Sequence, residues 1–591
     1  MMLRSAICVF VFVACGSAAL AQEPTPPPRD TARAPADTTN APVVQDSVRP
    51  IPQLAKHYLG PALGLSDAVW VWEQPDLLLE ASMTLGELLD RIPGILRMRT
   101  GLLIQPEAIS VFGSTANRLE VFLDGYQLDP FTEASVDITK IELVNIERVR
   151  VERRIGLIRI YIETVVATDN RAYTRVEAGV GEPESNMFRG ILLAPKLFFG
   201  PFGVSLDRMD TDGFNRQEPA DQFAGWVKWA YIRGKSGFQI EYRRMSTDRD
   251  PNIPWDAEHT RDDLIGHLRL NITNGVVAEL FGGRSTFEAD TLDPAEAEDT
   301  VPKVNEETFQ FGGRASFETP FVWAHGTARL RDNEAFPSLQ VYGSGGLRVS
   351  SIASVGADVT FADWRDAGTA LWYSAHGSIA PIAFIRAFGE YTSGERGAPW
   401  VYGPRDLRPF INGQTGYRVG GELKWRNGSV GGAYLHSEAD SVPVFGLPFD
   451  TIGPRVLGGH SAEGWEVSGI TPSFLHGFAI YGNVVNWMSG VGLYMPTRMF
   501  RVGIQHHSTP LRSGNLELYG RIELNHRGSM ITPLGVLPEF DVIDAYLQIR
   551  IIDVRIFGRF EDIIGEDAVD VAGRIVNGPR LFYGVKWHFW N

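Results

Sequence analysis

From about Arg171 onward, the sequence consists of segments of near ten residues in which apolar and polar side chains alternate. A tilted β-strand of about this length can cross a bilayer, and a period of two gives it one apolar and one polar face. Short connections occur at 199–201, 233–236, 274–275, 318–320 and 426–429, and long polar ones at 210–221, 246–263, 289–307, 392–413 and 437–460. Alternating short and long connections are typical of the two sides of a membrane barrel.

Counting hairpins through to the end gives roughly 22 strands, with both ends on the short-turn side. Strand boundaries between 337 and 380 stay open, because this stretch is rich in glycine. A soluble β-propeller or β-helix would show a motif repeated at a fixed period, and none is present. No apolar run of about 18 residues follows the N-terminal region, which excludes a helical membrane protein. The sequence therefore predicts an all-β membrane fold, an antiparallel outer-membrane β-barrel.

The N-terminal residues 1–21 have a basic start, an apolar run and the small-residue site Ala19-Leu20-Ala21. This pattern predicts a secretory signal peptide that is cut between Ala21 and Gln22. Lipidation at Cys15 is the alternative. Because Cys8 and Cys15 both lie in this segment, the processed chain is expected to have no disulfide and no cysteine metal site. The net charge of −16 makes nucleic acid an unsuitable partner.

Residues 22–64 follow as a leader rich in proline, alanine and threonine. Up to about Pro52 its composition cannot bury enough apolar surface to offset chain entropy, so a disordered tether is expected. The segment 51–80 is less polar and could pack on the domain that follows. The apolar pair Val43-Val44 is the notable feature of the tether itself.

An amphipathic helix is predicted within residues 83–94. Thr84 and Glu87 have capping-box spacing, Leu88 belongs to an apolar stripe, and Pro93 and Gly94 are expected to stop the helix. Two strands with polar faces are then predicted at 117–124 and 145–154. The first strand ends at an Asp124-Gly125 turn, and the second begins around Glu147 and Arg148. These elements make a small α+β unit with one face to bury.

In this order, the helix and the two strands resemble the plug of the TonB-dependent outer-membrane receptors. The resemblance implies a plug domain at 65–168 inside a barrel at 169–591. In typical members the second strand leads into a glycine-rich run, whereas here Arg153-Arg154-Ile155-Gly156 passes almost directly into 157–166. That shortcut predicts a shortened plug. The resemblance also implies that Val43-Val44 is the place for a short box that binds TonB, on weak evidence.

The C-terminal segment 580–591 has the alternation expected of a last barrel strand. Tyr583, Val585, Trp587 and Phe589 share one face, which can meet lipid, while Lys586 lies on the other. The ending resembles the aromatic signal that the barrel-assembly machinery recognises, although the chain continues for two residues beyond Phe589. We therefore expect that machinery, outer-membrane lipid and lipopolysaccharide as partners.

Candidate catalytic or metal-binding groups are few. The acidic stretches 248–263 and 290–299 could hold calcium or bridge lipopolysaccharide phosphates, but charge runs in loops are usually only solvated surface. His506 and His507 are adjacent in a predicted strand and point to opposite faces. The sequence contains neither the residue spacing of a known metal-binding motif nor the nucleophile elbow of a hydrolase. We expect no enzyme activity, no cofactor and no metal.

Two functions fit this sequence. The first is a receptor that captures an unidentified ligand at its outer loops and imports it through the plugged barrel. The second is a plugged barrel without TonB coupling, which would act as a channel, an adhesion surface or a structural protein. The sequence does not rank ligands, and it leaves the oligomeric state open.

Overall fold

The computed structural model of the chain describes residues 48–115, 118–131, 135–213, 219–249, 258–290, 303–398, 401–402, 406–407, 409–445, 456–576 and 578–590. Contacts divide the chain into two units, 1–48 and 49–591, and the second is described below. The predicted signal peptide, its Ala21-Gln22 cleavage site and the pair Val43-Val44 lie outside the described residues.

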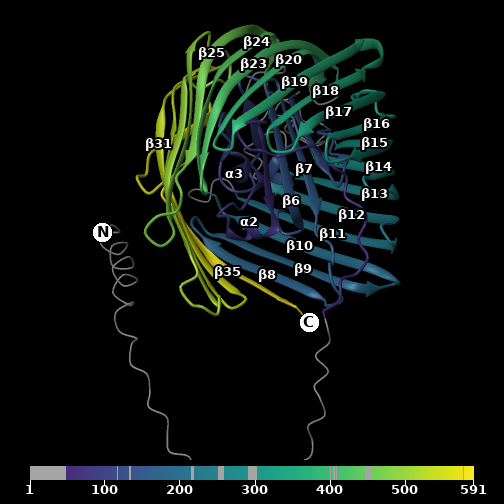
Figure 1. Cartoon of the computed structure of the whole chain (residues 1–591). Coiled ribbons are helices and arrows are strands. Elements are labelled where there is room, and N and C mark those ends of the chain that lie inside the picture. Colours follow the sequence, from purple (N-terminus) through teal and green to yellow (C-terminus); the bar gives the residue numbers. More distant parts are fainter. Residues whose placement is uncertain are drawn as a thin grey trace, which may run out of the picture. The chain divides into compact units, whose positions relative to one another are not determined.

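A closed barrel of 22 antiparallel strands makes up most of the second unit, as the sequence predicted (Figure 1). Strand β35 pairs with β8 and closes the ring. The strands are β8 (Tyr173–Gly181), β9 (Ser185–Leu197), β10 (Gly200–Thr211), β11 (Ala220–Arg233), β12 (Ser236–Arg249), β13 (Glu258–Thr273), β14 (Val276–Asp290), β15 (Lys303–Glu318), β16 (Val322–Arg331), β17 (Leu339–Val349), β18 (Ala353–Asp363), β19 (Thr369–Ile382), β20 (Ile385–Ala398), β23 (Phe410–Trp425), β24 (Gly428–Pro443), β25 (Val456–Ile470), β26 (Phe478–Ser489), β27 (Arg498–Ser508), β28 (Leu516–Arg527), β31 (Phe540–Ile551), β32 (Val554–Glu561) and β35 (Arg580–Trp590).

The two rims of the barrel differ in their connections. One rim, here called the turn side, carries tight turns such as 234–235, 274–275 and 426–427, together with the start of β8 and the end of β35. The other rim, the loop side, carries the longer connections. Three of these contain short hairpins, made by β21 (Val401–Tyr402) with β22 (Asp406–Leu407), β29 (Met530–Thr532) with β30 (Gly535–Leu537), and β33 (Ala568–Val571) with β34 (Arg574–Val576).

Several strands run further than the sequence predicted. Residues 246–263 were expected to form a loop, yet β12 continues to Arg249 and β13 begins at Glu258. Polar residues can extend a strand here because they keep the period of two beyond the apolar band. Asp263, for example, is fully buried on the inner face, where it pairs with Arg261.

The barrel wall has the inverse polarity of a soluble protein. On β10, Leu206 is 47% exposed on the outer face, while its neighbours Ser205 and Asp207 are buried on the inner face. The same order holds on β11 for exposed Val227 between buried Trp226 and Lys228. An apolar outer face and a polar inner face are what a bilayer requires of a barrel. Within the described residues, no helix is long and apolar enough to cross a membrane.

An α+β domain lies inside the ring of strands, as expected for the plug (Figure 1). Its main sheet has the order β1-β6-β7-β4-β5, with β4 and β7 parallel. A second pair is formed by β2 and β3. The elements are β1 (Val69–Glu73), α2 (Gln74–Leu79), α3 (Leu85–Leu89), β2 (Ile95–Arg99), β3 (Glu107–Val111), β4 (Leu119–Leu123), β5 (Tyr126–Gln127), the 3₁₀ turn η3 (Ile138–Lys140), β6 (Ile146–Arg154) and β7 (Leu157–Thr164).

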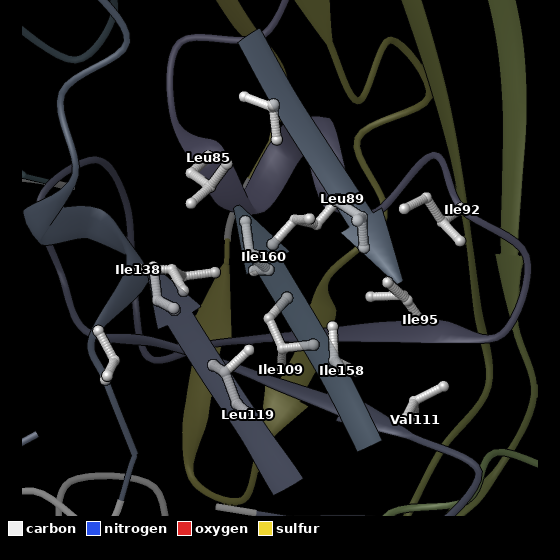
Figure 2. Close-up of a cluster of buried hydrophobic side chains, with 14 of the residues drawn as sticks. Leu85, Leu89, Ile92, Ile95, Ile109, Val111, Leu119, Ile138, Ile158 and Ile160 are labelled. Carbon is white, nitrogen blue, oxygen red and sulfur yellow. The ribbon is translucent and has the colours of Figure 1, made fainter. Parts of the chain in front are cut away.

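The plug has an apolar core of its own. Leu85 and Leu89 of α3 pack over Ile158 and Ile160 of β7, with Ile109 of β3 nearby (Figure 2). All five side chains are almost completely buried. The plug is thus a folded domain rather than a loop tucked into the barrel.

Helix α3 begins where the capping residues predicted. The Thr84 hydroxyl accepts a hydrogen bond from the backbone N–H of Glu87, and the Glu87 carboxylate accepts one from the N–H of Met83. The helix ends at Leu89, a turn earlier than expected from Pro93. Gly94 adopts a φ of +75°, and a Cβ there would lie 2.5 Å from the Phe112 ring.

Both predicted strands of the plug exist, and each is followed by a tight turn. Asp124 and Gly125 have φ values of 49° and 97° and join β4 to β5. The antiparallel strands β6 and β7 are joined only by Ile155-Gly156, which is the predicted shortcut. All five residues of β4 are buried, and its one polar side chain, Glu120, contacts arginines of the plug and the barrel rather than water.

The leader boundary at residue 64 was placed too far along the chain. Residues 49–64, which we call the strap, are extended along the turn side of the barrel interior. The backbone N–H of Ile51 donates to Thr168, and that of Ala55 donates to Lys235. The strap is therefore held in place by partners far away in the sequence. Its own composition could not predict these contacts.

Candidate functional site: the interface between plug and barrel

The plug meets the barrel through many charged side chains, beside apolar contacts such as that of Phe112 with Trp487. Acidic and basic residues that cannot enter the apolar plug core point outward, and polar residues of the wall point inward toward them. The direct ion pairs include Glu80–Arg521 (3.2 Å), Glu87–Arg559 (2.7 Å), Asp90–Arg501 (2.5 Å), Arg99–Asp570 (2.6 Å), Asp124–Lys228 (2.7 Å), Asp129–Arg331 (3.2 Å), Asp137–Arg249 (3.0 Å), Glu142–Arg243 (3.4 Å), Arg153–Glu466 (2.8 Å) and Arg159–Glu120 within the plug (2.7 Å). Such contacts surround the plug on several sides.

The tip of the β6–β7 hairpin forms the most deeply buried of these contacts. Arg153 binds Glu466 of β25 through two hydrogen bonds, and Arg418 of β23 binds the same carboxylate at 2.9 Å. The next residue, Arg154, lies 3.6 Å from both Asp358 and Glu390. Two plug arginines are thereby held by carboxylates of three different barrel strands.

A second group of contacts holds the edge of the plug sheet. Glu120 of β4 accepts from Arg159 of β7 at 2.7 Å and from Arg396 of the barrel. Burial alone would raise the pKa of Glu120, but the arginines outweigh it and hold this pKa well below its usual range. Glu120 thus stays ionised and links the plug to β20.

The Asp124 turn is tied to the barrel near the turn side. Lys228 of β11 donates to the Asp124 carboxylate at 2.7 Å and to the Thr164 hydroxyl at 2.6 Å. Burial opposes ionisation of Asp124, yet Lys228 and two hydrogen bonds from Thr164 lower its pKa below the usual value. The predicted turn residue is therefore also an anchor.

On the loop side, two hairpins cover the plug with apolar side chains. Met530 and Leu537 of the β29–β30 hairpin and Val571 of β33 pack with Leu96 and Met98 of β2. The covering side chains are almost fully buried. Entry from this side would require the hairpins to move.

The cavities between plug and wall include two that bear on function. One, of about 150 Å³, runs along α3 and β2 on one side and β26–β35 on the other, and arginines and carboxylates alternate along its lining. Among them are Arg97, Arg99, Arg527, Glu87 and Asp570. The other, of about 100 Å³, lies at the turn side between the strap, β7 and strands β9–β12.

The strap closes the second cavity. His57 is buried, and its Nδ1 lies 3.1 Å from the Ser316 hydroxyl, while its Nε2 lies 3.5 Å from Glu279. Burial and the nearby Arg314 lower the pKa of His57 to about 4. Its imidazole is accordingly neutral near pH 7. Arg150 of β6 donates to the carbonyls of Leu59, Gly60 and Pro61 and so fixes the strap to the plug.

The residues that the sequence singled out fall into three places. Thr84, Glu87, Leu88, Pro93 and Gly94 lie on or just after α3, and Asp124 and Gly125 form the turn after β4. Glu147 and Arg148 open β6 near the turn side, where Glu147 binds Lys56 of the strap and Arg148 lies 3.2 Å from Glu73. Glu87 and Asp124 reach the barrel directly.

The C-terminal residues lie in the wall. Tyr583, Val585 and Trp587 are 53%, 39% and 50% exposed on the outer face of β35, and Phe589 follows on the same face. Lys586 is buried on the inner face. The alternation read from the sequence therefore matches the faces of this strand.

The sequence reasoning missed Arg153, Arg154 and Arg159 as interface residues. A usable signal was present in the sequence, because charged residues stand on both faces of β6 although the domain was expected to lie inside a barrel. Among the described residues, no group of three or more histidines or carboxylates is arranged to hold a metal ion. His506 makes a tilted ring contact with Phe478, whereas His507 pairs with Glu517, so the two histidines do not converge.

Comparison with solved structures identifies similar folds at low sequence identity. The siderophore receptor PirA from Acinetobacter baumannii matches with a TM-score of 0.68 and 11% identity, covering 89% of this chain and 98% of that one. The ferric yersiniabactin uptake receptor FyuA from Yersinia pestis matches with a TM-score of 0.64 and 12% identity, covering 89% and 98%. FpvA of Pseudomonas aeruginosa, bound to a heterologous pyoverdine, matches with a TM-score of 0.66 and 10% identity, covering 89% and 86%.

No protein-family model and no curated protein matches the sequence. The shared fold confirms the architecture that the resemblance implied, an N-terminal plug inside a barrel of 22 strands. With its apolar outer face, the protein is an integral outer-membrane β-barrel.

Proposed function

We propose that the protein is an outer-membrane receptor that binds a ligand on the loop side and imports it by moving its plug. The observation that carries this proposal is the chemistry of the interface, where a folded plug is bound to the wall by charged pairs. Buried ion pairs are poor sources of net stability compared with apolar packing, because each charge loses its hydration. When water enters, the separated charges regain that hydration, which lowers the free-energy cost of opening the charged part of the interface.

The cavity along β26–β35 supports a route for the ligand. It lies between the plug and the wall, and its lining of arginines and carboxylates can solvate a polar solute. Displacement of α3 and β2 would join it to the loop side, where Arg99 already contacts Asp570 of the β33–β34 hairpin. One solved neighbour is named as a siderophore receptor and another as a ferric yersiniabactin uptake receptor, so a metal chelate is the ligand class we test first.

Energy for this movement would come from TonB, which would pull on the chain ahead of the strap. Because the strap contacts both plug and wall, a pull at residue 49 would act first on the contacts of Ile51, Ala55 and His57. Val43-Val44 is the segment we propose to bind TonB. The aromatic face of β35 would guide the barrel-assembly machinery.

A plugged barrel without TonB coupling is the second candidate. The apolar packing of the β29–β30 and β33–β34 hairpins on the plug favours it, since this cover closes the mouth at which a ligand would enter.

The two functions differ in what the leader does. Purified full-length protein and a variant lacking residues 22–47 are tested for binding to the periplasmic domain of TonB, and cells are tested for growth on ferric siderophores as iron sources. Import predicts that binding and growth are both lost with the leader. TonB binding that is absent in the full-length protein would rule out active import and support the second candidate.

A further inference from the structure

Three arginines form a row on the outer face of the barrel. Arg208 of β10, Arg244 of β12 and Arg284 of β14 have side chains that are 61%, 54% and 53% exposed. They occupy three alternate strands that all run from the turn side to the loop side. Arginine on the lipid-facing side of a barrel is unfavourable in mid-bilayer but tolerated at the interfaces, so the height of this row matters.

The three arginines lie at one height. Each is the eighth residue after the first residue of its strand, which is Gly200 for β10, Ser236 for β12 and Val276 for β14. Since all three strands begin at the turn side, equal distances along equally tilted strands give equal heights.

The strand register gives the same result independently. Across β11, Arg244 aligns with Leu206, two residues before Arg208. Across β13, Arg284 aligns with Tyr242, two residues before Arg244. Each arginine is thus displaced along its strand by two residues, about 6.6 Å, for every two strand spacings, about 9.6 Å. The line through the arginines therefore makes an angle of about 35° with the perpendicular to the strands. This equals the usual tilt of barrel strands, so the row runs parallel to the membrane plane.

The row stands at the loop-side edge of the apolar band. Eight residues of a tilted strand rise about 20 Å above the turns, and such a band is about 25 Å tall. Exposed Leu206, Tyr242 and Leu280 lie just below the arginines on the same strands. Above them, the outward positions carry the carboxylates Asp210, Asp248 and Glu288. Each strand therefore shows an apolar, then a basic, then an acidic tier.

Among the strands that run in the same direction, the row does not continue onto the three that follow β14. The eighth positions of β16, β18 and β20 hold Leu330, Phe361 and Ser393 instead of arginine. A general requirement of the membrane border would place basic residues around the whole ring. Three arginines on successive strands of one direction, followed by three strands without one, instead indicate recognition of something that contacts this face.

The ion pairs of the row leave the arginines available. Arg208 binds Asp221 at 2.8 Å, Arg244 lies 3.8 Å from Asp262, and Arg284 contacts Glu307. Exposed pairs of this kind contribute little stability, so they exchange readily for another anion. A guanidinium also has five N–H donors in a fork that suits a phosphate, and one carboxylate does not use them all.

We infer that the outer face of β10–β15 binds the phosphate groups of an outer-leaflet glycolipid through Arg208, Arg244 and Arg284. The turn side is the periplasmic side in bacterial barrels, which places the row at the headgroups of the outer leaflet. The acyl chains would lie on the apolar tier, and the carboxylates above would share the divalent cations that accompany lipid phosphates. This surface is separate from the import route and does not depend on it.

The test measures lipid binding to purified full-length protein in detergent by native mass spectrometry. The probes are bisphosphorylated lipid A, dephosphorylated lipid A and inorganic phosphate. The test variant carries Arg208→Gln, Arg244→Gln and Arg284→Gln. The matched control carries Arg233→Gln, Lys235→Gln and Arg426→Gln, which remove three exposed positive charges from the turn side.

We expect the wild-type protein to bind bisphosphorylated lipid A about tenfold or more tightly than the dephosphorylated form. The test variant should lose this preference and the control should keep it. A triple Arg→Lys variant retains the charges and should keep most of the preference, so it decides the outcome if the Gln variant does not fold. Equal binding of both lipids by the wild type, or complete competition by inorganic phosphate at equal concentration, would overturn the inference.

Discussion

Arg153 of the plug and Glu466 of the barrel bind each other through two hydrogen bonds, of 2.8 and 3.0 Å, and both side chains are fully buried. They are separated by 313 residues in the chain. Arg418 of the wall shares the same carboxylate and also lies 3.6 Å from Glu390, so Glu466 compensates Arg153 and part of the charge of Arg418. The tip of the β6–β7 hairpin is therefore sensitive to the loss of that acid.

Replacing Glu466 with Gln should loosen the plug. Removing one partner of a buried pair leaves uncompensated charge and typically costs about 3–5 kcal/mol. We expect faster tryptic cleavage of the plug in the folded barrel and a higher single-channel conductance in planar bilayers. Glu438→Gln is the matched control, because its side chain is 58% exposed on β24. Equal cleavage rates in the two variants would show that the pair does not hold the plug.

Acidification should release the strap between about pH 6.5 and pH 4. The pKa of His57 is about 4 in the folded protein, below the usual 6.5, so the unfolded segment binds more protons across this window. Stability of the docked strap is complete above pH 6.5 and falls by on the order of 3 kcal/mol as the pH drops to 4. A spin label at Ala62→Cys, an exposed strap position, should become more mobile over this range.

The control for the strap is the same label in a His57→Gln background. Glutamine does not titrate, so the mobility change should flatten. An unchanged pH profile in that background would assign the transition to another group.

The cap of α3 should fail at lower pH than the strap. Burial alone would raise the pKa of Glu87, but Arg559 and Arg97 outweigh it and bring this pKa to about 2. Its contribution is therefore present above about pH 4.5 and is lost as the pH falls toward 2, with a size on the order of 3 kcal/mol. Calorimetry of wild type and Glu87→Gln should show a destabilised plug transition at pH 7 and convergence near pH 2. Thr84→Ala, which removes only the neutral cap, should cost about 1 kcal/mol at either pH.

The loop-side cover can be tested with two adjacent residues of β30. Leu537 is buried against the plug, whereas Val536 is 69% exposed. Leu537→Ala should weaken hairpin docking by about 2–5 kcal/mol, and Val536→Ala should have little effect. The readout is the rate at which maleimide labels Ser110→Cys, a fully buried position of β3 beneath the cover. Identical labelling rates in the two backgrounds would mean that the hairpin does not control access.

The barrel could be predicted well because its signals are local. Alternation along each strand, such as exposed Tyr583 and Trp587 around buried Lys586, follows from the pleat of the backbone and needs no distant partner. The capping residues of α3 and the Asp124-Gly125 turn are local in the same sense. Strand ends were less well predicted, because Asp263 looks like a loop residue until Arg261 and the plug are placed beside it.

The candidate site could be predicted only in part. Glu87 and Asp124 were singled out for a cap and a turn. Their second role is to anchor the plug to Arg559 and Lys228, which lie 472 and 104 residues away in the chain. The packing of the strap likewise depends on the closed barrel. The equal height of Arg208, Arg244 and Arg284 depends on the register of its strands. The sequence by itself determined the period of the strands, their number and the small domain that precedes them, because these arise from neighbouring residues. Only the tertiary structure decided which charges meet, because a buried charge is stable only where the fold brings its counter-charge within a few ångströms.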